Sequence, residues 1–142
     1  MTLREIHPGA PDYEAALRLR EKVLRAPLGL SLTDTELADE LHCFHLGGFD
    51  GGRLIAILLL KHVDVSTAKM RQVAVAPDMQ GSGIGSELVA FAEAFARERG
   101  YVRMVAHARC TATGFYLRNG YSTSGGQFIE TTIPHILVSK DL

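Results

Sequence analysis

The residues best suited to chemistry are the glycines of a short turn in the middle of the chain, Gln80–Gly85 (QGSGIG). An apolar run, Val73–Val75, precedes the turn and ends at Pro77, and a segment with apolar residues at helical spacing follows it. Glycines let the backbone approach a ligand closely because no Cβ is in the way. The first amides of a helix have no internal partners and lie at the positive end of its dipole. The order strand, glycine turn, helix therefore predicts a binding site for a phosphate or pyrophosphate group.

Two common nucleotide-binding motifs do not fit this turn. The phosphate-binding loop of NTPases requires GxxxxGK[ST], but Ser86 and not lysine follows Gly85. A dinucleotide-binding turn requires GxGxxG and an acidic residue about 20 positions further on. Here the third glycine comes one residue early, and the chain near Arg103 is basic or apolar. The sequence therefore disfavours both kinds of site.

The segment Val75–Gly85 (VAPDMQGSGIG) closely resembles the acyl-CoA-binding signature of the GNAT superfamily of N-acetyltransferases. That signature is [QR]xxGx[GA] after a strand that ends in V-x-P. A second segment, Cys110–Tyr121, resembles the family's Ala-x-x-[FL]-Tyr-x-x-x-Gly-[FY] element, and the two segments stand in the family's order. Two shorter stretches, PLG at residues 27–29 and IPH at residues 133–135, are similar to one bacterial branch of the family.

The resemblance implies an α/β fold of the α+β type, the acyl-CoA N-acyltransferase fold. This fold has a mixed, mostly antiparallel twisted sheet of six to seven strands, flanked by helices, with one parallel pair that splays apart. The resemblance further implies one domain over residues 1–142. The implied enzyme moves an acetyl group from acetyl-CoA to a primary amine by direct attack in a ternary complex. A non-catalytic acyl-CoA-binding sensor or regulatory module is the alternative.

The resemblance also assigns residues to the cosubstrate, whose pantetheine arm would enter between the splayed strands. These residues are Val73, Ala74, Val75, Gln80, Gly81, Ser82, Gly83, Ile84, Gly85, Ser86, Arg109 and Tyr116. Arg109 stands where many family members have an asparagine that holds the CoA arm, so it could contact either the phosphates or the acceptor.

The reaction needs a neutral amine, a donor to the oxyanion and a proton for the departing thiolate. The resemblance makes Tyr116 the general acid and a backbone amide near Val73 the oxyanion donor. The base is left open between three residues, His107, Glu130 and His135, and a water chain without a dedicated base. No metal is implied.

These residues need a framework of strands and helices. The sequence predicts strands at residues 2–7, 42–49, 53–63, 70–75, 101–107, 127–131 and 136–139, with turns at Asp50–Gly52 and at residues 132–134. Helices are expected from Asp12 to Pro27, over residues 84–99, and after a capping box at residues 33–36. The family likeness makes the segment after the first helix a lining of the acceptor pocket, through Leu28, Leu30, Leu32, Asp34 and Glu36.

Composition limits the partners. The net charge of -1 gives no case for nucleic acid, and no apolar run is long enough to span a membrane. Two cysteines, Cys43 and Cys110, make no disulfide framework, so a reducing compartment and a cytoplasmic protein are expected. The expected partner is a small-molecule or peptide amine, and a homodimer is compatible with the family.

Overall fold

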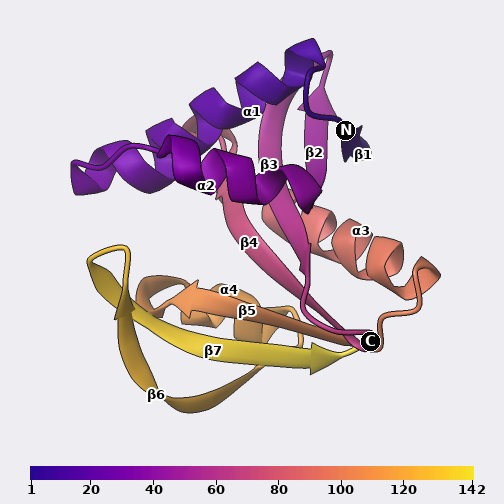
Figure 1. The fold of residues 1–142 in the computed structure, drawn as a ribbon, viewed down its shortest axis with the longest axis vertical. Coiled ribbons are helices and arrows are strands. Elements are labelled where there is room, and N and C mark those ends of the chain that lie inside the picture. The colour runs from indigo at the N-terminus through magenta and orange to yellow at the C-terminus, as the bar shows by residue number, and fades with distance from the viewer.

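The computed structural model describes residues 1–142 and shows one seven-stranded sheet with the strand order β1-β2-β3-β4-β5-β7-β6 (Figure 1). The strands are β1 Thr2–Ile6, β2 Phe44–Asp50, β3 Arg53–His62, β4 Thr67–Val75, β5 Arg103–Arg109, β6 Ser122–Glu130 and β7 Ile133–Asp141. The helices are α1 Pro11–Arg20, α2 Asp34–Asp39, α3 Ile84–Glu98 and α4 Thr113–Arg118. Short turns of 3-10 helix span Ala26–Leu28, Glu40–His42, Pro77–Met79 and Cys110–Ala112, and a π-helical turn spans Glu21–Arg25.

All neighbouring strands are antiparallel except β4 and β5. This parallel pair is joined only from Thr67, opposite Arg103, to Met70, opposite Ala106. Beyond that point the two strands diverge, as Figure 1 shows. The predicted fold class, a mixed sheet with a splayed parallel pair, is confirmed.

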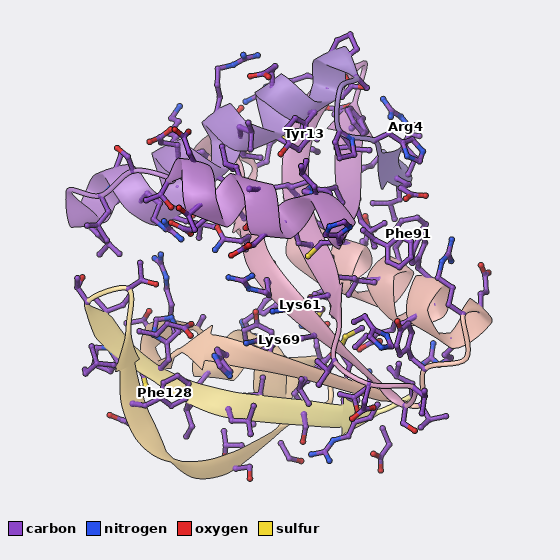
Figure 2. All side chains as sticks on the ribbon, in the orientation of Figure 1. Arg4, Tyr13, Lys61, Lys69, Phe91 and Phe128 are labelled. Carbon is purple, nitrogen blue, oxygen red and sulfur yellow. The ribbon has the colours of Figure 1, made fainter.

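The core forms where helices cover the β2–β4 part of the sheet. Every residue from Ile55 to Leu60 of β3 is buried, because α1 and α3 both contact this strand. Tyr13 of α1 lies between its helix and the sheet, where its ring meets the ring of His45 edge-on at 5.4 Å (Figure 2). From α3, Leu88, Val89, Ala92 and Ala96 are buried at the spacing expected of an amphipathic helix. This packing fixes the start of α3 against the end of β4.

The first helix differs from its prediction at both ends. Ala10 and not Asp12 is the residue before the first helical turn, and Asp12 instead forms an ion pair with Arg4 at 2.6 Å. The helix continues beyond Arg20 as a π-helical turn to Arg25. The capping box predicted for α2 is half formed. The Thr33 hydroxyl accepts a hydrogen bond from the Glu36 amide at 3.2 Å, but the Glu36 carboxylate pairs with Arg25 and the Thr33 hydroxyl and not with the Thr33 amide. No helix of the chain has both the length and the apolar character that a membrane crossing requires.

The C-terminal hairpin also differs from its prediction. Its strands are longer than expected, and the turn between them is Thr131–Thr132, where both residues have positive φ angles of 50° and 69°. Pro134 therefore lies inside β7 and not in the turn. The register between β6 and β7 shifts between Ser124 and Phe128, the stretch that contains Gly125.

Candidate functional site

A groove of about 550 Å³ runs along the glycine turn, the start of α3 and the free part of β4. Ten of the residues assigned to the cosubstrate line it: Val73, Ala74, Val75, Gln80, Gly81, Gly83, Ile84, Gly85, Ser86 and Tyr116. Ser82 does not line the groove, because its hydroxyl turns back and donates to the Met79 carbonyl at 2.6 Å. Arg109 does not line it either and lies in a second cavity.

The turn has the backbone geometry that an anion site needs. Gly81 and Gly83 have φ angles of 80° and 85°, which residues with a Cβ rarely adopt. No protein atom lies within 4 Å of where a Cβ would stand at either position, so this side of the turn is open. The amide side chain of Gln80 donates to the Val75 carbonyl at 3.0 Å and ties the turn to the end of β4. The turn is thus held in place while the first amides of α3 stay free of intrahelical partners.

Arg118, at the end of α4, is an exposed cation on the same groove, and sequence reasoning missed it. The only available signal was its place within the second family-like segment, directly before Asn119. The Asn119 side chain joins α4 to α3, donating to the Ser86 hydroxyl at 3.1 Å and to the Phe115 carbonyl at 2.8 Å. Arg118 is therefore held beside the start of α3.

Strand β4 is irregular where it leaves the sheet. Gln72 has a φ of 56°, and the register with β3 shifts between Ile57 and Leu59, so that Gln72 and Val73 have no partner residue in β3 or β5. Arg20 contacts this irregular part of β4, a β-bulge. It donates to the Gln72 side chain at 3.4 Å and forms a buried ion pair with Glu40 at 2.7 Å. At Val73, which lines the groove, the backbone therefore has no strand partner on either side.

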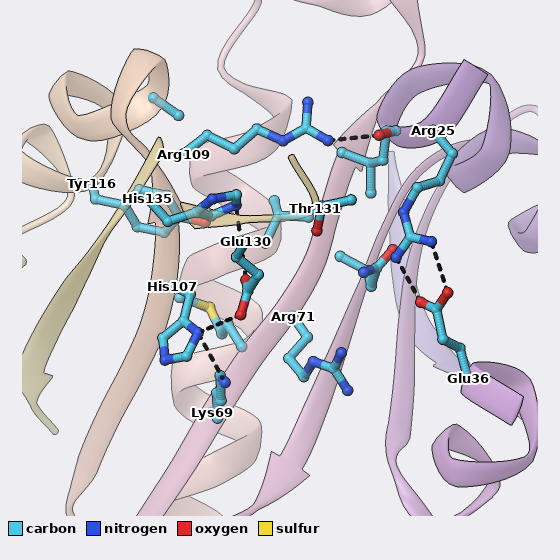
Figure 3. A pocket seen from close by; sticks show the side chains of 15 residues that line it. Arg25, Glu36, Lys69, Arg71, His107, Arg109, Tyr116, Glu130, Thr131 and His135 are labelled. Atoms are coloured by element: carbon cyan, nitrogen blue, oxygen red, sulfur yellow. Dashed lines mark hydrogen bonds and ion pairs between the residues drawn. The ribbon is translucent and has the colours of Figure 1, made fainter. Parts of the chain in front are cut away.

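A second, smaller cavity of about 250 Å³ lies beside the groove, and we call it the polar cavity (Figure 3). Its lining is Leu24, Arg25, Glu36, Lys69, Met70, Arg71, Gln72, Val73, His107, Arg109, Ala112, Tyr116, Glu130, Thr131 and His135. Three residues, Val73, Ala112 and Tyr116, line both the groove and the polar cavity. The two spaces therefore meet at Tyr116.

Tyr116 is 7% exposed and lies between the rings of Phe115 and Tyr121, with ring centres 5.2 and 5.7 Å away. Burial raises the pKa of its phenol to about 12. The hydroxyl is therefore protonated across the physiological pH range, and no protein group holds that proton by a hydrogen bond. Such a phenol is suited to donate a proton.

The three candidate bases form one cluster in the polar cavity (Figure 3). His107 Nδ1 lies 2.9 Å from one oxygen of Glu130, and His135 Nε2 lies 3.8 Å from the other. Burial alone would raise the pKa of Glu130, but the hydrogen bond and charge of His107 outweigh it, so this pKa falls below its ordinary value. The ionised carboxylate can only accept, so in this contact any hydrogen bond runs from His107 to Glu130.

A backbone contact orients the ring of His135. Its Nδ1 lies 2.9 Å from the Ile133 carbonyl, which can only accept, so Nδ1 is the donor of this hydrogen bond. Nε2, on the other side of the ring, points to the Glu130 carboxylate, 3.8 Å away. Because His135 is 5% exposed and Phe128 stacks on it at 6.1 Å, the ring is fixed in this orientation.

The polar cavity also holds three cations that were not among the expected site residues, Arg25, Lys69 and Arg71. Arg25 is neutralised by a two-bond ion pair with Glu36, at 2.9 and 2.6 Å. Burial and then the charge of Arg71 lower the pKa of Lys69, whose Nζ lies 3.3 Å from His107 Nδ1. The alternation of Lys69 and Arg71 along a strand was the available signal, because it places both on one face.

The structure narrows the segment expected to shape the acceptor pocket. Of Leu28, Leu30, Leu32, Asp34 and Glu36, only Glu36 lines the polar cavity, and the end of the first helix supplies Leu24 and Arg25 instead. Arg109 donates to the Leu24 carbonyl at 2.6 Å and so attaches this helix end to β5. No group of three or more His, Cys, Asp or Glu side chains is arranged to hold a metal ion.

Comparison with known proteins agrees with this geometry. YyaT of Bacillus subtilis (strain 168) is 32% identical over 76 residues, which are 54% of this chain but only about half (51%) of YyaT. A second protein of that strain, described as a candidate acetyltransferase, is 26% identical over 132 residues, 91% of this chain and 89% of the relative. The crystal structure of a candidate N-acetyltransferase from Lactobacillus plantarum has a TM-score of 0.85 and 26% identity, and covers 100% of this chain and 99% of that one.

A GNAT family acetyltransferase from Elizabethkingia anophelis, solved with acetyl-CoA bound, has a TM-score of 0.76. It covers 99% of this chain and 97% of that chain at 19% identity, so the likeness is one of fold alone. The family described as Acetyltransferase (GNAT) family matches residues 11–121. Since this match runs from the first residue of α1 to beyond the end of α4, the chain belongs to the GNAT family of acetyltransferases.

Proposed function

We propose that this enzyme transfers an acetyl group from acetyl-CoA to a primary amine, with the cosubstrate in the groove and the amine in the polar cavity. The observation that carries the proposal is the meeting of the two spaces at Val73 and Tyr116. A thioester that lies along β4 from the glycine turn would bring its carbonyl to this junction. An amine in the polar cavity would face the same carbonyl from the other side, as direct transfer requires.

The glycine turn and β4 would hold the cosubstrate. The free amides at the start of α3 and the cation of Arg118 suit a pyrophosphate. Beyond Met70, the side of β4 that faces β5 has no strand partner and offers donors and acceptors to the amides of a pantetheine arm. The backbone amide of Val73, beside the bulge, is the donor that we assign to the oxyanion.

Tyr116 would give its proton to the departing thiolate. Its phenol, with a pKa of about 12, keeps the proton until a stronger base forms beside it. His135 Nε2 would take the proton from the amine, and the Glu130 carboxylate 3.8 Å away would stabilise the imidazolium that results. His107 holds Glu130 in place through the 2.9 Å contact.

Tyr116→Phe tests the assignment of the acid, since it removes only the hydroxyl. We expect kcat to fall by roughly 10² to 10⁴-fold while the Kd for CoA changes little. Steady-state kinetics with acetyl-CoA and a panel of primary amines, together with CoA titration calorimetry, measure both quantities. Tyr101→Phe, which removes an exposed phenol that bonds to His62, is the control and should keep full activity.

An unchanged kcat in Tyr116→Phe would remove the acid from this mechanism. The sensor alternative makes a different prediction for the wild-type protein. It requires CoA binding without release of CoA for any amine in the panel.

A further inference from the structure

The polar cavity carries more positive charge than its neighbours neutralise. Arg25 and Glu36 cancel in their two-bond ion pair, which leaves three cations, Lys69, Arg71 and Arg109, against one carboxylate, Glu130. The whole chain has a net charge of -1, so this excess is local and does not reflect a basic protein.

Two of these cations keep donors free for a ligand. Arg71 makes no ion pair or hydrogen bond with any of the residues that line the polar cavity (Figure 3). Arg109 uses one nitrogen of its guanidinium for the Leu24 carbonyl. Burial and then the charge of Arg25 lower the pKa of Arg109, as expected for a cation that lacks a counter-ion.

The charge excess limits the acceptor. A polyamine would bring further cations beside Lys69, Arg71 and Arg109, and like charges at short range in a partly buried cavity repel strongly. An amine that also carries an anionic group would neutralise the excess, and a planar guanidinium binds carboxylate or phosphate oxygens with two parallel bonds. The volume of about 250 Å³ lies just below the ~300 to 1,000 Å³ usual for small-molecule sites, which favours a small acceptor.

We propose that the acceptor is a small amine with an anionic group, a carboxylate or a phosphate, that Arg71 binds this group, and that the charge of Arg109 adds to the attraction. The inference rests on the proposed function, because it concerns the amine that fills the polar cavity during transfer. The positive charge of the polar cavity also affects the protonation of the bound amine. Nearby cations disfavour an ammonium, so they help the bound amine to lose the proton that blocks its attack.

The test compares amines that differ only in the anionic group. With acetyl-CoA as donor, glycine, β-alanine and 4-aminobutyrate are each measured against the alkylamine of the same chain length, and 2-aminoethylphosphonate against ethylamine. Spermidine represents the polycations. Products are quantified by mass spectrometry, because the free thiols of Cys43 and Cys110 would react with a thiol reagent.

We expect kcat/KM to be at least roughly tenfold higher for the best anionic amine than for its neutral partner, the size of a charge-assisted hydrogen bond. Comparing kcat/KM for the carboxylate amines with kcat/KM for 2-aminoethylphosphonate shows which anion is preferred. Arg71→Gln should raise KM for the anionic amine and leave the alkylamine unchanged. Arg18→Gln, an exposed residue of α1, is the matched control and should change neither.

A second measurement decides the inference even if no amine reacts. N-acetyl-β-alanine and its uncharged amide are titrated into the CoA-bound protein, and the acid should bind roughly tenfold more tightly, with the difference lost in Arg71→Gln. Binding of this kind without turnover would reject the proposed function but keep the anion site. Equal binding of acid and amide, or a preference for propylamine or spermidine as acceptor, would reject the anion site. Faster transfer from succinyl-CoA than from acetyl-CoA to propylamine would assign the anion site to the acyl group and overturn the inference.

Discussion

At the scale of single residues, the candidate site combines a buried phenol with a cluster of two histidines and a carboxylate. Burial raises the pKa of Tyr116 to about 12, which suits the acid that we propose, and the Ile133 carbonyl holds the ring of His135 through Nδ1. Both groups line one cavity. In the proposed mechanism Tyr116 donates a proton and His135 accepts one.

If His135 accepts the proton from the amine, replacing His135 should lower kcat/KM most at pH values where the free amine is protonated. We expect His135→Gln to lower kcat/KM by roughly 10²-fold near pH 7, and the deficit should shrink as the pH approaches the pKa of the free amine. A pH profile of kcat/KM for wild type and variant measures this. His42→Gln, an exposed histidine outside the cavity, is the control. A deficit of the same size at every pH would indicate a structural role.

At the scale of elements, the strand–turn–helix unit provides most of the groove in which we place the cosubstrate. The φ of 85° at Gly83 and the open space beside it show why glycine is required there. A side chain at this position would both strain the backbone and enter the space in front of the first α3 amides.

Gly83→Glu should therefore weaken CoA binding by roughly 100-fold or more, which corresponds to about 2.7 kcal/mol. A carboxylate at the start of α3 would repel the pyrophosphate and compete for the same amides. Gly83→Ala is the matched control, because it carries the backbone strain without the charge and should lose far less affinity. Titration calorimetry with CoA measures both variants. Equal Kd values for Gly83→Glu and wild type would contradict the placement of the phosphates.

At the scale of the whole molecule, the sequence predicted what depends on local signals. The glycine turn, the following helix and the Asp50–Gly52 hairpin each have composition cues within a few residues, and they are present. The turn Thr131–Thr132 could not be predicted, because β-branched residues disfavour positive φ and only tertiary contacts enforce it. The cluster of candidate bases joins His107 of β5 to Glu130 of β6 and His135 of β7. It forms because β7 lies between β5 and β6, a strand order that no local pattern reveals.

The ion pair between Arg25 and Glu36, where the helices border the polar cavity, is another contact that no local sequence pattern reveals. Arg25 meets Glu36 across the loop between α1 and α2, and this ion pair lowers the pKa of Glu36 from 4.5 to about 2, chiefly through the hydrogen bond from Arg25. A carboxylate whose pKa is lower in the folded state stabilises that state above pH 4.5. The contribution is lost as the pH falls from 4.5 towards 2.

Glu36→Gln should then reduce the free energy of unfolding by about 2 kcal/mol at pH 7, allowing for the partial exposure of the pair. The gap between wild type and variant should narrow by roughly 1 kcal/mol between pH 6 and pH 3.5. Urea denaturation at several pH values measures it. Glu14→Gln, on the exposed side of α1, should show no such dependence. A gap that stays constant over this range would mean that the charge of Glu36 contributes nothing.

The short seam between β4 and β5 has a mechanical consequence. Only four residue pairs, from Thr67–Arg103 to Met70–Ala106, connect the two halves of the sheet directly. A cosubstrate arm bound between the diverging strands would add contacts between the two halves of the sheet where strand pairing is absent. Each release of CoA would then briefly loosen the two halves against one another. The enzyme would be most rigid when both substrates are bound.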